Sequence, residues 1–344
     1  MSPIIRACER RGVDYSIIHT GQHYSYEMDQ AFFDQLELPN PSHNLGVGSG
    51  SQAEQTGRIL IGVESLLVKE RPEVVLVQGD TNSDLAGALA ASKLGVKVGH
   101  VEAGLRSFDR RMPEEINRVI TDHISDYLFA PTETARQNLE HEGIAESKIR
   151  VTGNTIVDAV NQNLELSRRK SRALKSFNLE SGNFFLVTVH RAENVDSEAN
   201  FSGIINGLKA IRKEYDIPLI LPLHPRSLKM AKEFNLDVSG LTVISPIDYL
   251  DFLSLEANAK VVLTDSGGVQ EESCILGVPC VTLRENTERP ETVEVGANRI
   301  VGTTVDGIVD GVRDAMSGKK KWRNPFGNGN AGDLIMSYLS EVLS

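Results

Sequence analysis

The chain of 344 residues has few cysteines, no long apolar run and no excess of positive charge. Its three cysteines, Cys8, Cys274 and Cys280, show no CxxC spacing, which argues against a disulfide framework or a zinc site. No stretch approaches the roughly 18 uninterrupted apolar residues of a membrane-spanning helix, and no charged start followed by an apolar run indicates a secretory signal. The formal net charge of −11 argues against a general binder of nucleic acid or anionic membranes, but leaves room for a local pocket that takes a phosphorylated small molecule. We therefore expect a cytoplasmic protein.

The composition is that of an ordinary globular protein, with 40% hydrophobic and 24% charged residues. These values exclude a disordered, collagen-like or low-complexity chain. The length is too great for one ordinary core and suits two domains.

Strand-like and helix-like stretches alternate along the chain, which predicts an α/β fold with parallel sheets. The first series of apolar runs lies at 14–19, 73–77, 96–101, 127–130 and 149–152, with helices expected at 112–124 and 132–142. A second series lies at 184–189, 219–223, 241–244, 261–264 and 280–283. The polar stretch 162–182 between them is the best linker candidate. We expect an N-terminal Rossmann-like domain over 1–160, a C-terminal one over 161–330, and a last helix over 331–344 that packs back on the first domain.

The beginning of the chain does not fit this scheme. Ser2–Arg10 is expected to form a helix, with Ser2 as its N-cap and Pro3 in its first turn. A doubly wound domain normally begins with a strand and a phosphate-facing loop before such a helix. Either this domain starts unusually or its first strand and loop are missing.

Three acidic residues in the first half follow expected strands or begin a helix. Asp80 follows one strand after a glycine, Glu102 follows the next strand, and Glu114 lies at a helix start. Ligands of doubly wound sheets bind beyond the carboxyl ends of the strands, so these carboxylates are candidates for one crevice. Each alone is equally well explained as a cap or helix-dipole partner, but three on consecutive elements favour a site.

Two histidines end strands in the second half. His190-Arg191 follows one strand and His224-Pro225-Arg226 follows the next. Histidine and arginine at strand ends suit a crevice that binds an anion and needs an acid or base. A single such histidine would more often be a surface or packing residue.

The strongest local signal is the segment from Thr264 to Glu272, a strand followed by Ser266-Gly267-Gly268 and a helix. Open backbone N–H groups at a helix N-terminus hold a phosphate without a metal, and Glu272 is placed to accept hydrogen bonds from ribose hydroxyls. A plain tight turn is the alternative, but the nearby cationic segment around Arg289 favours a ligand. The Gly46-x-Gly48-x-Gly50 segment lacks the framing of a dinucleotide fingerprint, and no HExxH or His-Cys cluster suggests a metal.

A series of motifs resembles those of the non-hydrolysing UDP-N-acetylglucosamine 2-epimerases, in order through nearly the whole chain. They are Gly79-Asp80-Thr81, His100-Val101-Glu102-Ala103-Gly104-Leu105-Arg106, Pro113-Glu114-Glu115-x-Asn117-Arg118, Thr152-Gly153-Asn154-Thr155, His190-Arg191, Asp265-Ser266-Gly267-Gly268-Val269-Gln270-Glu271-Glu272, Thr287-Glu288-Arg289-Pro290-Glu291 and Asn324-Pro325-Phe326-Gly327-Asn328-Gly329.

The resemblance implies the GT-B architecture, two Rossmann-like domains that face a central cleft, in a homodimer that serves polysaccharide biosynthesis. It implies reversible interconversion of UDP-GlcNAc and UDP-ManNAc, by elimination of UDP to 2-acetamidoglucal and re-addition, with no cofactor. By matched position it assigns catalytic roles to Asp80, Glu102, Glu114 and His190. It assigns substrate binding to Arg118, His224, Phe252, Ser266, Gly267, Gly268, Glu272 and Arg289.

Two departures from the family pattern stand out. The family begins with a strand and a Gly-Thr-Arg-Pro-Glu…Lys segment whose Arg and Lys line the active site, and this sequence starts just after it. We therefore expect that the first strand of the N-terminal domain is missing and that folding and activity suffer. A possible allosteric pair, Gln22-His23, is followed by Tyr24 and Ser25 in place of the usual Arg and Gln.

Two other functions remain open. A GT-B glycosyltransferase would share the fold and the nucleotide site, although the cluster of acidic residues argues against it. A non-catalytic binder of nucleotide sugars would result if the missing segment abolished turnover.

Overall fold

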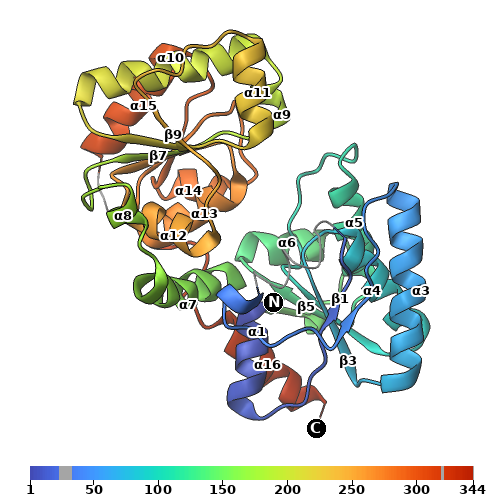
Figure 1. Ribbon diagram of the computed structural model, residues 1–344. Coiled ribbons are helices and arrows are strands. Elements are labelled where there is room, and N and C mark those ends of the chain that lie inside the picture. Colours follow the sequence, from blue (N-terminus) through green and yellow to red (C-terminus); the bar gives the residue numbers. More distant parts are fainter. Residues whose placement is uncertain (23–32, 319–320, 344) are drawn as a thin grey trace. The chain divides into compact units, whose positions relative to one another are not determined.

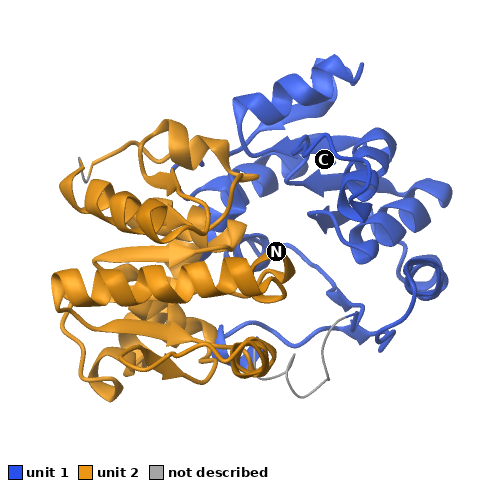
Figure 2. Ribbon diagram, turned by 90° about the horizontal axis from the view of Figure 1, so that it is seen from above, with its two compact units in different colours: residues 1–159, 326–344 blue, residues 160–325 orange. Residues whose placement is uncertain are grey.

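The computed structural model describes residues 1–22, 33–318 and 321–343 (Figure 1). By their internal contacts these residues divide into two compact units, coloured separately in Figure 2. Unit 1 comprises Met1–Ala159 and Phe326–Ser344, and unit 2 comprises Val160–Pro325. Both units are built on parallel sheets, so the predicted α/β class is confirmed.

Unit 1 has a four-stranded parallel sheet in the order β3-β4-β5-β6 and a separate parallel pair, β1 with β2. The strands are β1 (Ile18–His19), β2 (His43–Asn44), β3 (Val74–Gln78), β4 (Lys97–Val101), β5 (Tyr127–Ala130) and β6 (Ile149–Val151). The helices are α1 (Ser2–Arg11), α3 (Gln52–Glu70), α4 (Asn82–Lys93), α5 (Pro113–Ile124), α6 (Glu133–His141) and α16 (Ala331–Val342), with a 3₁₀ turn at Glu146–Lys148. Within the described residues, no strand joins β1 to β3.

The two ends of unit 1 pack together. Apolar residues of α1 and α16 share a core cluster with β4 and β5, and Asp158 accepts hydrogen bonds from the first two amides of α16 at 3.1 and 3.0 Å. A Cβ at Gly332 would lie 2.9 Å from the carbonyl oxygen of Pro3, so this approach of α16 to α1 requires glycine. The N-cap of α1 is Met1, and Ser2 is the first helical residue, not the cap that the sequence suggested.

Unit 2 has one six-stranded parallel sheet in the order β12-β11-β10-β7-β8-β9. The strands are β7 (Phe185–Thr188), β8 (Leu219–Pro222), β9 (Thr242–Ile244), β10 (Val261–Thr264), β11 (Cys280–Thr282) and β12 (Asn298–Ile300), the last of which the sequence did not reveal. The helices are α8 (Ala173–Ser176), α9 (Ala192–Val195), α10 (Glu198–Tyr215), α11 (Pro225–Glu233), α12 (Tyr249–Asn258), α13 (Gly267–Leu276), α14 (Pro290–Glu294) and α15 (Val305–Ser317).

Both faces of this sheet are apolar, and successive residues of a strand serve opposite faces. On β7, Phe185 and Val187 pack against α10 and α15, whereas Leu186 of the same strand and the preceding Phe184 pack on the side of α12 (Figure 1). Strands covered on both faces read as continuous apolar runs, which is why they stood out in the sequence.

The stretch 162–182, which the sequence offered as a linker candidate, is mostly helical. Helix α7 (Thr155–Lys170) runs through the boundary between the units, and α8 follows it. The helical pattern was hidden because polar Asn163 and Ser167 occupy buried positions of α7. The Ser167 hydroxyl is satisfied there by donating to the Leu250 carbonyl oxygen at 2.7 Å.

Candidate functional site

In unit 1, Asp80 and Glu102 follow the adjacent strands β3 and β4, whose carboxyl ends meet at one edge of the sheet. Gly79 has φ +94°, which favours glycine, and Glu102 itself has φ +70°. Non-glycine residues held in such a conformation are concentrated at functional sites. The Glu102 Oε1 accepts a hydrogen bond from the side-chain amide of Gln78 at 2.6 Å. The structure therefore brings two of the three predicted carboxylates to the same edge of the sheet.

Arg118 lies between two carboxylates. Its guanidinium forms an ion pair with Asp80 and a second one with Glu115 at 3.0 Å. Glu115 is buried and also accepts from the backbone amides of Ser107 and Phe108 at 2.9 and 3.0 Å. Glu115 thus anchors the loop after β4, and Arg118 links that loop to Asp80.

Glu114 stands apart from this cluster. It is exposed in the first turn of α5, and within the described residues it forms no ion pair or hydrogen bond. The carboxylate of α5 that the fold ties into the cluster is its neighbour Glu115.

A buried ionic cluster, which the sequence reasoning did not single out, lies behind the Gly79–Asp80 turn. His100 Nδ1 lies 2.6 Å from Asp122 Oδ1, and its Nε2 lies 2.9 Å from the Gly79 carbonyl oxygen. Arg106 reaches the other Asp122 oxygen at 2.7 Å and is held by Glu142. Because both partners of His100 are acceptors, both ring nitrogens carry protons.

The charges of this cluster stabilise one another. Burial disfavours the charged form of His100, but the hydrogen bond and the charge of Asp122 outweigh it and raise the pKa of His100. Burial likewise opposes ionisation of Asp122, yet His100 and Arg106 together lower its pKa. The sequence signal that was missed is the spacing of Glu115, Arg118 and Asp122, which places three ionic side chains on one face of α5.

In unit 2, His190 follows β7 and its ring is fixed by Asp265, which follows β10. The Nδ1 of His190 lies 2.9 Å from Asp265 Oδ1, and the fully buried Asp265 also accepts from the amides of His190 and Arg191, each at 3.0 Å. Burial opposes ionisation of Asp265, but these hydrogen bonds, the one from His190 foremost, lower its pKa. The sequence motif contained Asp265 without revealing this role. A histidine oriented in this way can exchange a proton at its outer nitrogen.

The segment Ser266-Gly267-Gly268 begins α13, as the sequence predicted. The Ser266 side chain makes no capping hydrogen bond, and a Cβ at Gly267 or Gly268 would meet nothing closer than 3.7 Å. The N-terminal amides of a helix lack partners within the helix and favour an anion. Further along α13, the buried Glu272 accepts a hydrogen bond from the Tyr249 hydroxyl at 2.9 Å.

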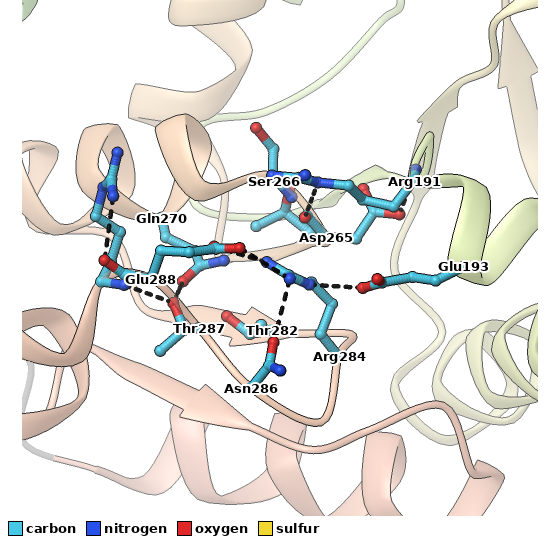
Figure 3. Close-up of polar contacts among 12 residues, drawn as sticks. Arg191, Glu193, Asp265, Ser266, Gln270, Thr282, Arg284, Asn286, Thr287 and Glu288 are labelled. Carbon is cyan, nitrogen blue, oxygen red and sulfur yellow. Dashed lines mark hydrogen bonds and ion pairs between the residues drawn. The ribbon is translucent and has the colours of Figure 1, made fainter. Parts of the chain in front are cut away.

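Arg289 and Arg284 organise the loop after β11. The Nε of Arg289 lies 2.9 Å from Glu271 Oε1, so its charge is already shared with α13. Figure 3 shows Arg284 between Glu193 on one side and Glu288 on the other, at 2.8 Å from each. These bonds lower the pKa of Glu288 to about 2 and tie the loop to the segment that follows His190. Sequence reasoning missed Arg284.

Three further residues that the sequence assigned to substrate binding or regulation have structural contacts of their own. His224 is the N-cap of α11, where Nδ1 accepts from the Arg226 amide at 3.2 Å. Phe252 of α12 is partly buried against the core on one face of the sheet. Gln22 accepts a hydrogen bond from the Ser83 hydroxyl at 2.7 Å, whereas His23 lies outside the described residues.

No helix among the described residues is long and apolar enough to cross a bilayer. In the same part of the chain, no group of three or more His, Cys, Asp or Glu residues is arranged to hold a metal ion.

Comparisons with known proteins give the family. Residues 6–340 match the model of the family described as UDP-N-acetylglucosamine 2-epimerase. The UDP-N-acetylglucosamine 2-epimerase of Methanocaldococcus jannaschii is 56% identical, over 99% of this chain and 95% of that protein. Its solved structure in complex with UDP-GlcNAc and UDP has a TM-score of 0.87 at 56% identity, again over 99% of this chain and 95% of that one. The UDP-2,3-diacetamido-2,3-dideoxy-D-glucuronate 2-epimerase of Pseudomonas aeruginosa is 42% identical, over 97% of this chain and 93% of that protein. The predicted GT-B fold class is thereby confirmed, and the chain belongs to the UDP-N-acetylglucosamine 2-epimerase family.

Proposed function

We propose that this protein interconverts UDP-GlcNAc and UDP-ManNAc by reversible epimerisation at C2 of the sugar. The observation that carries the proposal is the position of Asp80 and Glu102 at the carboxyl ends of adjacent strands. The C2 proton is not next to a carbonyl group, so simple abstraction is difficult. In the proposed route, the C2 proton is removed as the C1–O bond to UDP breaks, which gives 2-acetamidoglucal. UDP then adds back to C1 and a proton returns to C2 on the opposite face.

The route needs groups that remove and return protons. We assign these catalytic roles to Asp80, Glu102, Glu114 and His190. Because Nδ1 of His190 donates its hydrogen bond to Asp265, its Nε2 is left for proton exchange. Arg118 supports the cluster through its ion pair with Asp80.

The nucleotide is assigned to residues of unit 2. The open amides at Ser266–Gly268 and the guanidinium of Arg289 neutralise the diphosphate, and Glu272 accepts the ribose hydroxyls. Phe252 is assigned to the uracil and His224 to substrate binding. The reaction is redox-neutral, so it needs no nicotinamide. We expect turnover to survive EDTA, and a loss that added Mg²⁺ or Mn²⁺ restores would contradict this.

Assembly, location and regulation extend the proposal. A homodimer is supported by exposed apolar side chains on α3, where Ile61 is 66% and Val68 is 55% exposed. Sedimentation of the wild-type chain beside an Ile61→Glu variant tests it. We place the enzyme in the cytoplasm, and we retain Gln22 and His23 as a candidate regulatory site.

The decisive experiment is incubation with UDP-GlcNAc in D₂O, followed by NMR. We expect deuterium at C2 together with UDP-ManNAc. UDP-GlcNAc that stays unchanged, with no deuterium at C2, would contradict the proposal. UDP-2,3-diacetamido-2,3-dideoxy-D-glucuronate in a parallel reaction tests whether the second sugar class is preferred.

The same experiment separates the two other functions. A glycosyltransferase would consume UDP-GlcNAc only with an acceptor and without C2 exchange. A non-catalytic binder would take up UDP without changing the sugar.

A further inference from the structure

Two glutamates lie together in the interior of unit 2. Glu256 belongs to α12 and Glu272 to α13, two helices that pack against each other (Figure 1). Glu256 is 0% exposed and Glu272 is 8% exposed. Among the residues that the structure describes, neither forms an ion pair with a lysine, arginine or histidine. Two ionised carboxylates at such depth would repel each other without compensation.

The hydrogen bonds around the pair show where a proton fits. Oε1 of Glu256 accepts from the Ser273 hydroxyl at 2.9 Å, and Oε1 of Glu272 accepts from the Tyr249 hydroxyl at 2.9 Å. Oε2 of Glu256 is buried and receives no hydrogen bond from any donor in the described part of the chain. Ser273, the donor to Glu256, directly follows Glu272 in α13, and Tyr249, the donor to Glu272, lies two turns before Glu256 in α12, so the two carboxyl groups face each other. Carboxylate oxygens only accept, so a bond between them requires a proton on one.

The surroundings favour Glu256 as the residue that keeps this proton. Burial and then the charge of Glu272 raise the pKa of Glu256 well above its usual value. Burial also raises the pKa of Glu272, but hydrogen bonds from Tyr249 and Glu256 oppose that rise. The other titratable groups that face the pair are the Tyr249 phenol and the Cys280 thiol of β11, and burial raises the pKa of each. None of them supplies a positive charge.

We propose that Glu256 holds a proton at neutral pH and donates it from Oε2 to Glu272, which alone carries the negative charge of the pair. Glu272 then receives two donors, Tyr249 and Glu256, which fix its carboxylate for the ribose hydroxyls of the nucleotide. Glu256 is a positioning residue that acts through Glu272. The ribose contact of Glu272 rests on the proposed function, whereas the shared proton rests on unit 2 alone.

The proton is tested in the wild-type protein labelled with ¹³C at the side-chain carboxyl of glutamate. Carboxyl carbons report protonation, and Glu256 and Glu272 are the glutamates of the described residues whose pKa is raised. At neutral pH we expect one carbon at the shift of a protonated carboxyl, which disappears in Glu256→Gln. Absence of such a carbon in the wild-type protein, or its persistence in Glu256→Gln, would overturn the proposal.

The positioning role is tested by UDP affinity. Glu256→Leu removes the donor to Glu272, and we expect UDP to bind about tenfold more weakly, the effect of one hydrogen bond to a charged group. Glu256→Gln keeps a neutral donor and should recover most of that loss. Leu255→Ala, a change at the adjacent fully buried position of α12, should lower Tm without weakening UDP binding.

Two results would overturn the positioning role: Glu256→Leu with wild-type affinity, or Glu256→Gln as weak as Glu256→Leu. Failure of the epimerase assignment is a separate result. Wild-type protein that leaves UDP-GlcNAc unchanged overturns the proposed function, while the carbon measurement still decides the shared proton.

Discussion

The two units bury acidic side chains in opposite ways. In unit 1, Asp122 lies between two cations, His100 at 2.6 Å and Arg106 at 2.7 Å, and its pKa is lowered. In unit 2, Glu256 is equally buried beside another carboxyl group, and its pKa is raised. Asp122 and Glu256 are equally buried, so the charges of the neighbouring side chains decide whether each acid stays ionised.

The charge of Asp122 is compensated by neighbouring cations, whereas a negative charge on Glu256 would face another carboxylate. The ion pairs around Asp122 favour its charged form, and through His100 they support the turn that carries Asp80. The Glu256–Glu272 pair has no such cation among the described residues, and burial together with the charge of Glu272 raises the pKa of Glu256. In the proposed function, unit 1 thus holds the assigned acid–base groups by compensated charges, whereas the assigned ribose contact of unit 2 depends on an uncompensated pair.

The sharpest test of this division is Asp80→Asn, which removes a charge from the turn in unit 1 and keeps its shape. We expect turnover to fall by roughly 10²–10⁴-fold, the usual contribution of a positioned acid or base. UDP affinity, measured by calorimetry, should be retained because the assigned nucleotide contacts lie in unit 2.

The matched control is Glu133→Gln. Glu133 pairs with Arg136 on α6 and its side chain is 57% exposed, so turnover should not change. A near-normal rate for Asp80→Asn would remove Asp80 from the catalytic assignment.

The next largest effect is expected from Asp122→Ala. Removing Asp122 leaves the buried His100 without its counter-charge and Arg106 with Glu142 alone, which costs about 3–5 kcal/mol of unfolding free energy. Asp310→Ala breaks an exposed ion pair with Arg313, side chains 69% and 55% exposed, and should cost about 1 kcal/mol or less. Thermal unfolding compares the two, and equal losses would show that burial of the cluster adds nothing.

The fold was largely predictable because the strands are covered on both faces. Such strands appear as apolar runs, so most strands of both sheets were located from the sequence. Exceptions have physical causes. The short β12 contains the polar residue Asn298, so its sequence is not an apolar run. Asn298 is buried, and it donates hydrogen bonds to Thr292 and Gln270.

Site residues that follow a strand could be predicted from the sequence. Residues that lie inside a helix or strand could not. Asp80, Glu102 and His190 stand one or two residues after a strand. His100 lies inside β4, and Asp122 lies near the end of α5. Their roles come from contacts across 22 residues of chain, which local patterns do not contain. Glu256 was hidden for the same reason, since only packing brings it to Glu272.

The smallest of the three predicted losses concerns Arg284. Like Arg106 in unit 1, it is a buried arginine that contacts two carboxylates. Its guanidinium is 6% exposed and binds Glu193 and Glu288. Because the hydrogen bond from Arg284 lowers the pKa of Glu288 from 4.5 to about 2, this carboxylate stabilises the fold above pH 4.5 and loses that effect as pH falls toward 2. Arg284→Met should therefore cost about 1.5–3 kcal/mol at neutral pH, the range for hydrogen bonds to charged groups.

The difference in unfolding free energy between wild type and Arg284→Met should shrink as pH falls from 4.5 to 2, because Glu288 progressively takes up a proton in the folded wild-type protein over this range. Arg313→Met is the matched control, since Arg313 also faces two carboxylates, Glu214 and Asp310, but is 55% exposed. It should cost about 1 kcal/mol or less and show little pH dependence. A loss in Arg284→Met that stays constant between pH 7 and pH 2 would mean that packing, not the charge of Glu288, makes Arg284 stabilising.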